Sequence, residues 1–185
     1  MRTQMCALGA ICTLWAAAAV QAADSSPEVS VTGGKIRGTT ASYGGAVFKG
    51  IPFAQPPIGE LRWREPAPVK SWSGIRDTNQ FSAPCTQAGP GTSEDCLYLN
   101  VWTTEWPAKS PKAVMVWFHG GGNFAGAVSD PLFDGESLAR HGVLLVTAQY
   151  RLGVFGFFSH PELTRESAHR ASGNFGLLDQ IAALR

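Results

Sequence analysis

The fold is decided by residues 114–124, which read Val-Met-Val-Trp-Phe-His-Gly-Gly-Gly-Asn-Phe. The first five residues are apolar and favour a β-strand, and the run ends at three glycines. This pattern predicts a buried strand that delivers a backbone loop to the carboxyl edge of a sheet, where open α/β sheets bind ligands. Glycines allow the positive φ values and the close approach to the main chain that such a loop needs. A glycine-rich turn that only reverses the chain is the alternative.

Residues 1–22 have the pattern of a secretory signal peptide. Arg2 precedes an apolar run that ends in Val-Gln-Ala, a small-residue cleavage pattern. A membrane anchor is the alternative, although the run is short for a span and no second apolar run of spanning length follows. The residues before Cys12 also leave a lipoprotein cleavage site open. We therefore expect export without stable membrane insertion.

Composition and charge limit the remaining possibilities. The chain is 44% hydrophobic and 16% charged, which suits one packed domain or a piece of a larger one. Arg2 is one of 15 Lys and Arg residues, so the 14 that remain after export balance the 14 Asp and Glu. No basic surface for nucleic acid or an anionic membrane is expected.

Cys85 and Cys96 stay in the expected mature segment, 23–185. Export would place them where disulfides persist, and a bridge between them would contribute roughly 3 kcal/mol in the chain-entropy model. Two free thiols are the alternative. No His or second Cys pair stands at ligand spacing, so we expect no metal site.

Further segments predict a mixed α/β chain. Residues 29–37, interrupted by Gly33-Gly34, predict an antiparallel hairpin, and residues 47–53 predict another strand. Residues 50–63 contain prolines and predict an irregular surface connection without a helix; a proline-rich recognition ligand is the alternative.

Three apolar runs predict strands of a mixed or parallel sheet buried on both faces: 97–102, 114–118 and 143–149. Residues 131–141 predict a crossover with a short helix, which has four apolar residues available for packing: Leu132, Phe133, Leu138 and Ala139. A second helix is predicted from Phe175 onward, with Asn174 as its possible cap.

Six motifs occur in order along the chain: Gly-Ile-Pro-Phe-Ala at 50–54, Pro-Pro-x-Gly-x-Leu-Arg-Trp at 56–63, Ser-Glu-Asp-Cys-Leu-Tyr-Leu-Asn-Val-Trp at 93–102, His-Gly-Gly-Gly at 119–122, Tyr-Arg-Leu-Gly at 150–153 with Gly-Phe at 156–157, and Gly-Asn-Phe-Gly-Leu-Leu-Asp-Gln at 173–180. Together they resemble the N-terminal part of a type-B carboxylesterase, the family that also contains cholinesterases and neuroligins. The resemblance implies an α/β-hydrolase fold with a mostly parallel central sheet and an N-terminal antiparallel ribbon, incomplete here. Residues 23–185 would be the N-terminal portion of the catalytic domain.

The same resemblance implies a secreted or periplasmic serine hydrolase that cleaves a small-molecule carboxylic ester through an acyl-enzyme, without metal or organic cofactor. Gly121 and Gly122 would donate the N–H groups of the oxyanion hole. His119 and Gly120 would position this loop, because the general base of this fold comes last in the sequence. The short segment between Cys85 and Cys96 lacks aromatic residues, which argues against choline esters.

Two buried salt bridges are implied by the resemblance, Arg62 with Glu94 and Arg151 with Asp179. Their role would be structural. If a strand has begun at Glu94 and Asp95, these neighbouring carboxylates point to opposite faces of it and do not form a catalytic dyad. Three further histidines lie in polar connections and are expected to be solvated: His141, His160 and His169.

A nucleophile elbow, Gly-x-Ser-x-Gly, does not occur in these 185 residues. Five candidate serines lack the flanking glycines: Ser129, Ser137, Ser159, Ser167 and Ser172. The resemblance places the nucleophile, the acid and the catalytic histidine beyond Arg185, so a polypeptide that ends there is predicted to be inactive. A neuroligin-like adhesion protein without a nucleophile and a truncated, inactive gene product are the alternatives.

Overall fold

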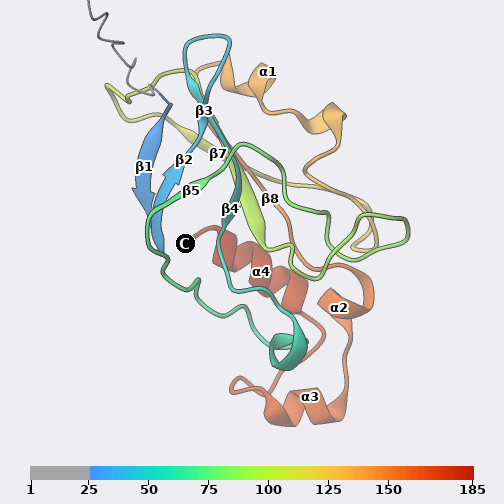
Figure 1. Ribbon diagram of the computed structural model, residues 1–185. Helices are drawn as coiled ribbons and strands as arrows, with labels where there is room; N and C mark the ends of the chain where they lie inside the picture. The colour runs from blue at the N-terminus through green and yellow to red at the C-terminus, as the bar shows by residue number, and fades with distance from the viewer. Residues whose placement is uncertain (1–25) are drawn as a thin grey trace, which may run out of the picture.

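The computed structural model describes residues 26–185, so the signal peptide expected at 1–22 lies outside the described residues. The described chain forms a three-stranded and a five-stranded sheet, with helices at two ends of the larger one (Figure 1). The small sheet consists of β1 (Glu28–Val31), β2 (Gly34–Arg37) and β5 (Ile75–Asp77). The large sheet has the order β3-β4-β6-β8-β7. Its strands are β3 (Thr39–Thr40), β4 (Ala46–Pro52), β6 (Tyr98–Thr103), β7 (Val114–Phe118) and β8 (Leu144–Ala148).

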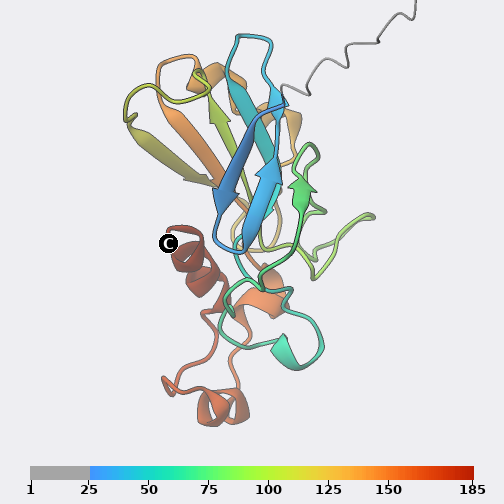
Figure 2. The same ribbon diagram turned by 60° about the vertical axis from the view of Figure 1, so that its left-hand side comes forward.

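β1 and β2 form the predicted N-terminal antiparallel ribbon. Its turn is Thr32-Gly33 and not Gly33-Gly34, because Gly34 already pairs with Val31. A Cβ on Gly34 would lie 2.6 Å from the indole nitrogen of Trp72, so the second glycine makes room for this ring. The ribbon lies in front of the large sheet in Figure 2, and an apolar core fills the space between them.

Strand directions in the described part of the large sheet are mixed, which is one of the two arrangements that the apolar runs predicted. β7 and β8 run parallel, whereas the pairs β3–β4, β4–β6 and β6–β8 are antiparallel. One parallel pair and three antiparallel pairs therefore make up the described part of the sheet. The length of each connection sets the relative strand direction. The long crossover 119–143 allows β7 and β8 to run parallel, whereas the tight turn between β3 and β4 makes that pair antiparallel.

β7 is an edge strand among the described residues, and the prediction of a buried strand is wrong for its first half. Val114 is 61% exposed and Met115 is 46% exposed. The reason is that β8 covers one side of β7 and no strand of residues 26–185 pairs with the other side. Val116, Trp117 and Phe118 are half-buried, so β7 is better covered toward its carboxyl end.

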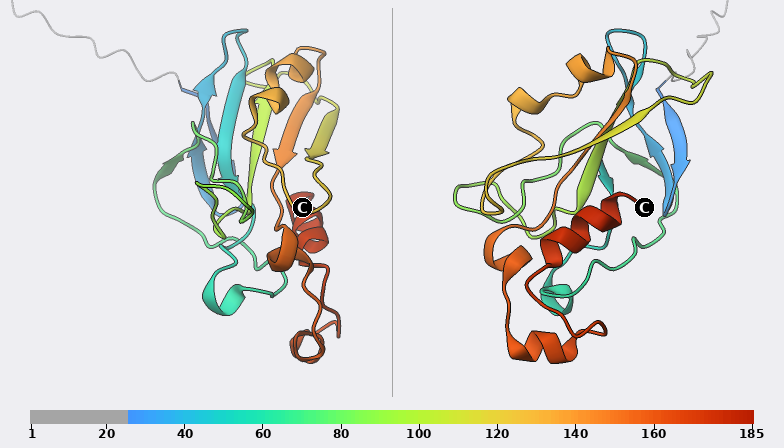
Figure 3. Two further views of the ribbon diagram at one scale, coloured as in Figure 1. Left: turned by 90° about the vertical axis from the view of Figure 1, so that its right-hand side faces the viewer. Right: turned by 180° about the vertical axis from the view of Figure 1, so that it is seen from behind.

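The helices are α1 (Glu136–Ala139), α2 (Gly153–Phe157), α3 (Pro161–Glu166) and α4 (Phe175–Ala183), with short 3-10 turns η1 (Gly59–Leu61) and η2 (Pro131–Phe133). The turn η1 corrects the expectation that residues 50–63 hold no helical turn. α1 lies at one end of the large sheet, and α2, α3 and α4 gather at the other end (Figures 1 and 3).

Packing of the crossover and of α4 is less complete than predicted. Ala139 is buried and the Phe133 ring lies 4.5 Å from the Trp117 ring, but Leu132 is 81% exposed and Leu138 is 45% exposed. In α4, Phe175, Gly176 and Asp179 are buried. Asn174 occupies the N-cap position without making a side-chain cap, and its Oδ1 is buried without a partner in the described part of the chain.

Candidate active site

The glycine loop, residues 119–126, begins directly after β7. Because β7 and β8 are parallel, the segments that follow them leave the sheet at the same edge. Tyr150, which follows β8, stacks its ring on the His119 ring at 4.6 Å and donates from its hydroxyl to the His119 carbonyl oxygen at 2.8 Å. Burial raises the pKa of Tyr150, so the phenol keeps the proton that it donates. The start of the glycine loop is thereby fixed to the sheet.

Two glycines of the loop meet different requirements. Gly121 has a φ of 115°, and a Cβ there would lie 1.9 Å from the Ala125 carbonyl oxygen. Gly122 has a φ of 62°, and its Cβ would meet nothing closer than the Phe124 ring at 3.9 Å. Asn123 also has a positive φ, 64°. Consequently glycine is obligatory at 121 for space and backbone, whereas at 122 only the backbone conformation favours it.

Two N–H groups in the glycine loop are not used by the chain. Carbonyl oxygens accept hydrogen bonds at five positions: His119, Gly120, Gly121, Asn123 and Gly126. By contrast, within residues 26–185 the backbone N–H groups of Gly121 and Gly122 donate no hydrogen bond. Both residues are exposed. The loop therefore presents two unused N–H donors at the surface, while five of its carbonyl oxygens are held in internal contacts.

His119 is 3% exposed and lies beneath this loop. Its Nδ1 is 2.9 Å from the Gly120 carbonyl oxygen, and because a carbonyl only accepts, Nδ1 carries the proton. The Nε2 atom is buried and has no partner among residues 26–185. Burial lowers the pKa of His119 below its ordinary value, partly offset by the bond to Gly120. His119 is thus an enclosed imidazole that hydrogen-bonds the backbone of its own loop.

Two contacts hold the middle and the end of the glycine loop. Gly153, the first residue of α2, donates from its N–H to the Asn123 carbonyl oxygen at 2.7 Å. Gln87 binds both backbone groups of Gly126: its Nε2 is 2.8 Å from the Gly126 oxygen and its Oε1 is 2.9 Å from the Gly126 nitrogen. The sequence analysis missed Gln87, Gly126 and Gly153. The only available signal for Gln87 was its place two residues after Cys85.

Cys85 and Cys96 form a disulfide in the structure, with their Cα atoms 5.0 Å apart. Both residues are buried in an apolar cluster that also contains Leu97, Tyr150 and Leu152. The segment that the disulfide closes carries Gln87 and therefore reaches the end of the glycine loop.

The structure brings together both arginine–carboxylate pairs, but only one of them is buried. Asp179 accepts from Arg151 at Nε (2.8 Å), Nη2 (2.7 Å) and the backbone N–H (3.0 Å), with side-chain exposures of 0% and 3%. Arg62 and Glu94 make two hydrogen bonds of 2.6 Å, but their side chains are 38% and 22% exposed. The expectation of a buried bridge is therefore wrong for Arg62–Glu94, because solvent reaches this pair.

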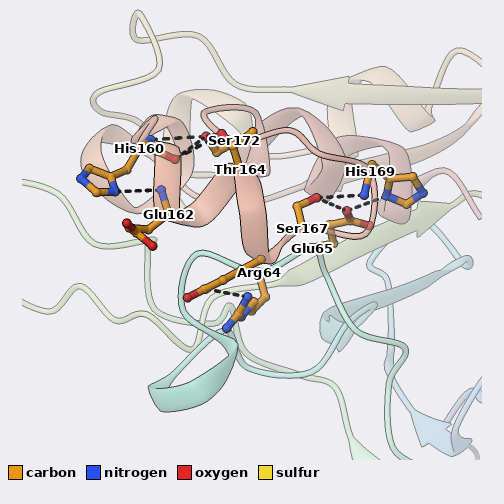
Figure 4. Close-up of polar contacts among 9 residues, drawn as sticks. Arg64, Glu65, His160, Glu162, Thr164, Ser167, His169 and Ser172 are labelled. Carbon is orange, nitrogen blue, oxygen red and sulfur yellow. Dashed lines mark hydrogen bonds and ion pairs between the residues drawn. The ribbon is translucent and has the colours of Figure 1, made fainter.

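The other histidines lie away from the glycine loop, and all three are exposed. His160 and His169 are nevertheless engaged around α3, as Figure 4 shows. The Nδ1 of His160 accepts from the N–H of Glu162 and caps α3, while the Nδ1 of His169 lies 2.6 Å from Oε1 of Glu65. These contacts are structural, so the expectation of merely solvated side chains is incomplete for both residues.

No histidine ring within residues 26–185 hydrogen-bonds to any of the five candidate serines, Ser129, Ser137, Ser159, Ser167 and Ser172. Over the same residues, no group of three or more His, Cys, Asp and Glu is arranged to hold a metal ion. None of the helices described between residues 26 and 185 combines the length and apolar character that crossing a membrane requires.

Comparison with known proteins agrees with this geometry. The model of the carboxylesterase family matches residues 25–185. Fumonisin B1 esterase of Sphingopyxis macrogoltabida is 47% identical over 146 residues, which cover 75% of this chain and 27% of that protein. Para-nitrobenzyl esterase of Bacillus subtilis is 44% identical over 163 residues, which cover 82% of this chain and 32% of that protein.

Solved structures show the same relationship. A carboxylesterase of Geobacillus stearothermophilus superimposes with a TM-score of 0.77 at 40% identity, covering 85% of this chain and 33% of that one. The architecture is thus the α/β-hydrolase fold, of which the described residues form a part. The chain spans only 27% and 32% of the lengths of the two curated relatives. On the family match, the sequence identity and the shared fold, the chain belongs to the carboxylesterase family.

Proposed function

We propose that this chain is the oxyanion-stabilising part of a serine carboxylic-ester hydrolase, which acts through an acyl-enzyme intermediate. In such a reaction a serine attacks the ester carbonyl carbon, and negative charge develops on the carbonyl oxygen. The N–H groups of Gly121 and Gly122 would donate to that oxygen. The serine, its acid and its base would come from the portion of the complete protein that follows Arg185.

The observation that carries this proposal is the pair of unused donors in the glycine loop. The N–H groups of Gly121 and Gly122 donate no hydrogen bond within residues 26–185, although the backbone on either side of them is hydrogen-bonded. Donors that are fixed before the substrate arrives need no reorganisation when the charge develops. One such donor typically lowers the barrier by about 3 kcal/mol.

The remaining residues would support this geometry without touching the substrate. His119 and Gly120 hold the start of the glycine loop, and the buried Arg151–Asp179 pair stabilises the segment on which that loop rests. The disulfide between Cys85 and Cys96 and the Arg62–Glu94 pair would stabilise the surrounding loops. No metal or organic cofactor is required for this chemistry.

The substrate would be a small carboxylic ester. The two relatives are named for different substrates, fumonisin B1 and a para-nitrobenzyl group, so we propose the reaction and not a particular alcohol. Nucleic acid is not a proposed partner, because basic and acidic residues balance after residue 22.

We also propose export to the periplasm or the outside of the cell, with residues 1–22 as a cleaved signal peptide and residues 23–185 as the start of the catalytic domain. The Cys85–Cys96 disulfide supports this, because structural disulfides persist mainly in oxidising compartments. N-terminal sequencing of the processed protein, with a new terminus at or near Ala23, is the direct check.

Labelling of the complete gene product with a fluorophosphonate, followed by mass spectrometry of the modified peptide, tests the proposed reaction. We expect one labelled serine, beyond Arg185, in a Gly-x-Ser-x-Gly sequence. A folded full-length protein that takes no label would contradict the proposal and leave a non-catalytic member of the fold, such as an adhesion protein. A label on any serine of residues 26–185 would contradict our placement of the nucleophile.

A further inference from the structure

Gln87 is the one side chain outside the β7–β8 region that hydrogen-bonds the backbone of the glycine loop in the described part of the chain. Its amide makes a paired contact with Gly126, accepting from the N–H at 2.9 Å and donating to the oxygen at 2.8 Å. Its Nε2 also donates to the Cys85 carbonyl oxygen at 3.1 Å. Gln87 thus joins the disulfide-closed segment to the last residue of the glycine loop.

Gly126 is tightly packed, so the Gln87 contact acts on a position with no room to shift. A Cβ there would lie 2.3 Å from Nδ1 of His119 and 2.6 Å from the Gly120 oxygen, so the Gly126 backbone packs directly against the start of the loop. A displacement of Gly126 therefore also displaces His119 and Gly120. The residues between them, including Gly121 and Gly122, are held at both ends by this contact.

The glycine loop is fixed at three places. Tyr150 holds its start and Gly153 its middle, and both follow β8. Gln87 holds its end, and it is 39 residues away in sequence. In Figures 1 and 3 the segment around residues 85–95 lies beside the glycine loop, in agreement with these bonds. Without Gln87, the end of the loop would lose both of its side-chain hydrogen bonds.

We propose that Gln87 is a positioning residue for the oxyanion hole, and that the Cys85–Cys96 disulfide acts on the reaction through it. This inference rests on the proposed ester hydrolysis. The disulfide holds Cys85, Cys85 and Gly126 together hold the Gln87 amide, and that amide sets where the N–H groups of Gly121 and Gly122 point. Misplacement of catalytic groups by about 1 Å can cost about 100-fold in rate, so a small shift at Gly126 has a measurable effect.

The test uses the complete protein and an activated ester. Gln87→Ala is expected to lower kcat about tenfold, because the donors are displaced but not removed, while KM changes less than about twofold. A trifluoromethyl ketone, whose serine adduct carries the oxyanion, should bind about tenfold more weakly for the same reason. Gln87→Met keeps most of the side-chain volume without the amide, so it should lose as much as Gln87→Ala.

Gln55→Ala is the matched control, because Gln55 also donates to a backbone carbonyl, that of Pro68, and among the described hydrogen bonds neither residue bonds to residues 119–126. It should leave kcat and inhibitor binding unchanged. Joint replacement of Cys85 and Cys96 by Ser should lower kcat in the wild-type background, and should add little in the Gln87→Ala background if the effect passes through Gln87.

The outcomes separate the two proposals. A wild-type protein that hydrolyses the ester, together with a Gln87→Ala variant of unchanged kcat, overturns this inference alone. Activity restored by Gln87→Met, or fully additive effects of the disulfide and Gln87 replacements, would also overturn it. A folded wild-type protein that hydrolyses no ester overturns the proposed function and this inference with it.

Discussion

Residues 41–45 and the glycine loop, residues 119–126, both contain glycine at positive φ, but their backbone groups are hydrogen-bonded in different ways. In the segment 41–45, which joins β3 to β4, the N–H of Gly44 donates to Ala41 at 3.0 Å and the N–H of Ala41 donates to Gly45 at 2.9 Å. These two hydrogen bonds close the turn within its own residues. In the glycine loop the N–H groups of Gly121 and Gly122 donate no hydrogen bond within residues 26–185, and residues outside the loop bond to its backbone.

The comparison shows what separates a turn from a binding loop when both are rich in glycine. A turn that only reverses the chain needs no support from distant residues, since its own hydrogen bonds close it. The glycine loop is held by Tyr150, Gly153 and Gln87 instead, so its free donors are fixed by contacts from elsewhere. This difference argues against the reading of residues 119–126 as a simple turn.

The largest effect is expected where the support of the loop is buried. Arg151 lies between Tyr150 and Gly153, and its only carboxylate partner among the described salt bridges is Asp179. Asp179→Asn would leave the arginine charge buried and unneutralised, at a cost of about 3 to 5 kcal/mol in the free energy of unfolding. Urea unfolding of the complete protein measures this loss.

Glu94→Gln provides the control for that variant. It breaks the partly exposed ion pair with Arg62, so it should lower the free energy of unfolding much less. Equal losses for the two variants would show that burial does not distinguish the pairs.

Gly121→Ala should affect the reaction more than any other single change in the glycine loop. The added Cβ would lie 1.9 Å from the Ala125 oxygen at a φ of 115°, so the loop must move. We expect kcat/KM to fall about 100- to 1000-fold, or about 3 to 4 kcal/mol of barrier, as for loss of an oxyanion donor. Gly122→Ala should lose much less, because its φ of 62° is one that alanine can adopt at modest cost and its Cβ meets nothing closer than 3.9 Å.

Gly44→Ala is the corresponding change in the turn. Its φ is 87° and a Cβ there would meet nothing within 4 Å, so only backbone strain opposes the substitution. We expect a loss of about 1 to 2 kcal/mol in the free energy of unfolding and an unchanged kcat/KM. Steady-state kinetics together with urea unfolding would show both. A fall in kcat/KM close to that of Gly121→Ala would remove the distinction between the two segments.

The smallest effect concerns His119 and pH. Burial lowers its pKa in the folded protein below 6.5, so the unfolded chain takes up the proton first as the pH falls. His119 therefore contributes full stability above about pH 6.5, and this contribution is lost as the pH falls from there through the lowered folded-state pKa. The slope is at most about 1.4 kcal/mol per pH unit. Urea unfolding between pH 7.5 and 5 should show a steeper fall for the wild type than for His119→Gln, and parallel curves would contradict this.

Local sequence patterns predicted much of the fold and part of the site. The apolar runs located β6, β7 and β8 because buried strands need continuous apolar residues, and the glycines after β7 marked the loop. Strand direction and the exposure of Val114 were not predictable in this way, since they depend on which strand lies alongside. Solvent access to Arg62 and Glu94 was not predictable either, because both lie in loops and their cover depends on segments distant in sequence. Gln87 was missed because a single glutamine carries no pattern, and its partner Gly126 is distant in sequence.

The most direct test of the oxyanion assignment is a crystal structure of the complete protein after reaction with a fluorophosphonate. The account predicts a phosphonylated serine beyond Arg185, with the phosphonyl oxygen about 2.7 to 3.1 Å from the backbone nitrogens of both Gly121 and Gly122. An adduct whose oxygen is bound by other donors, with these two N–H groups unengaged, would contradict it.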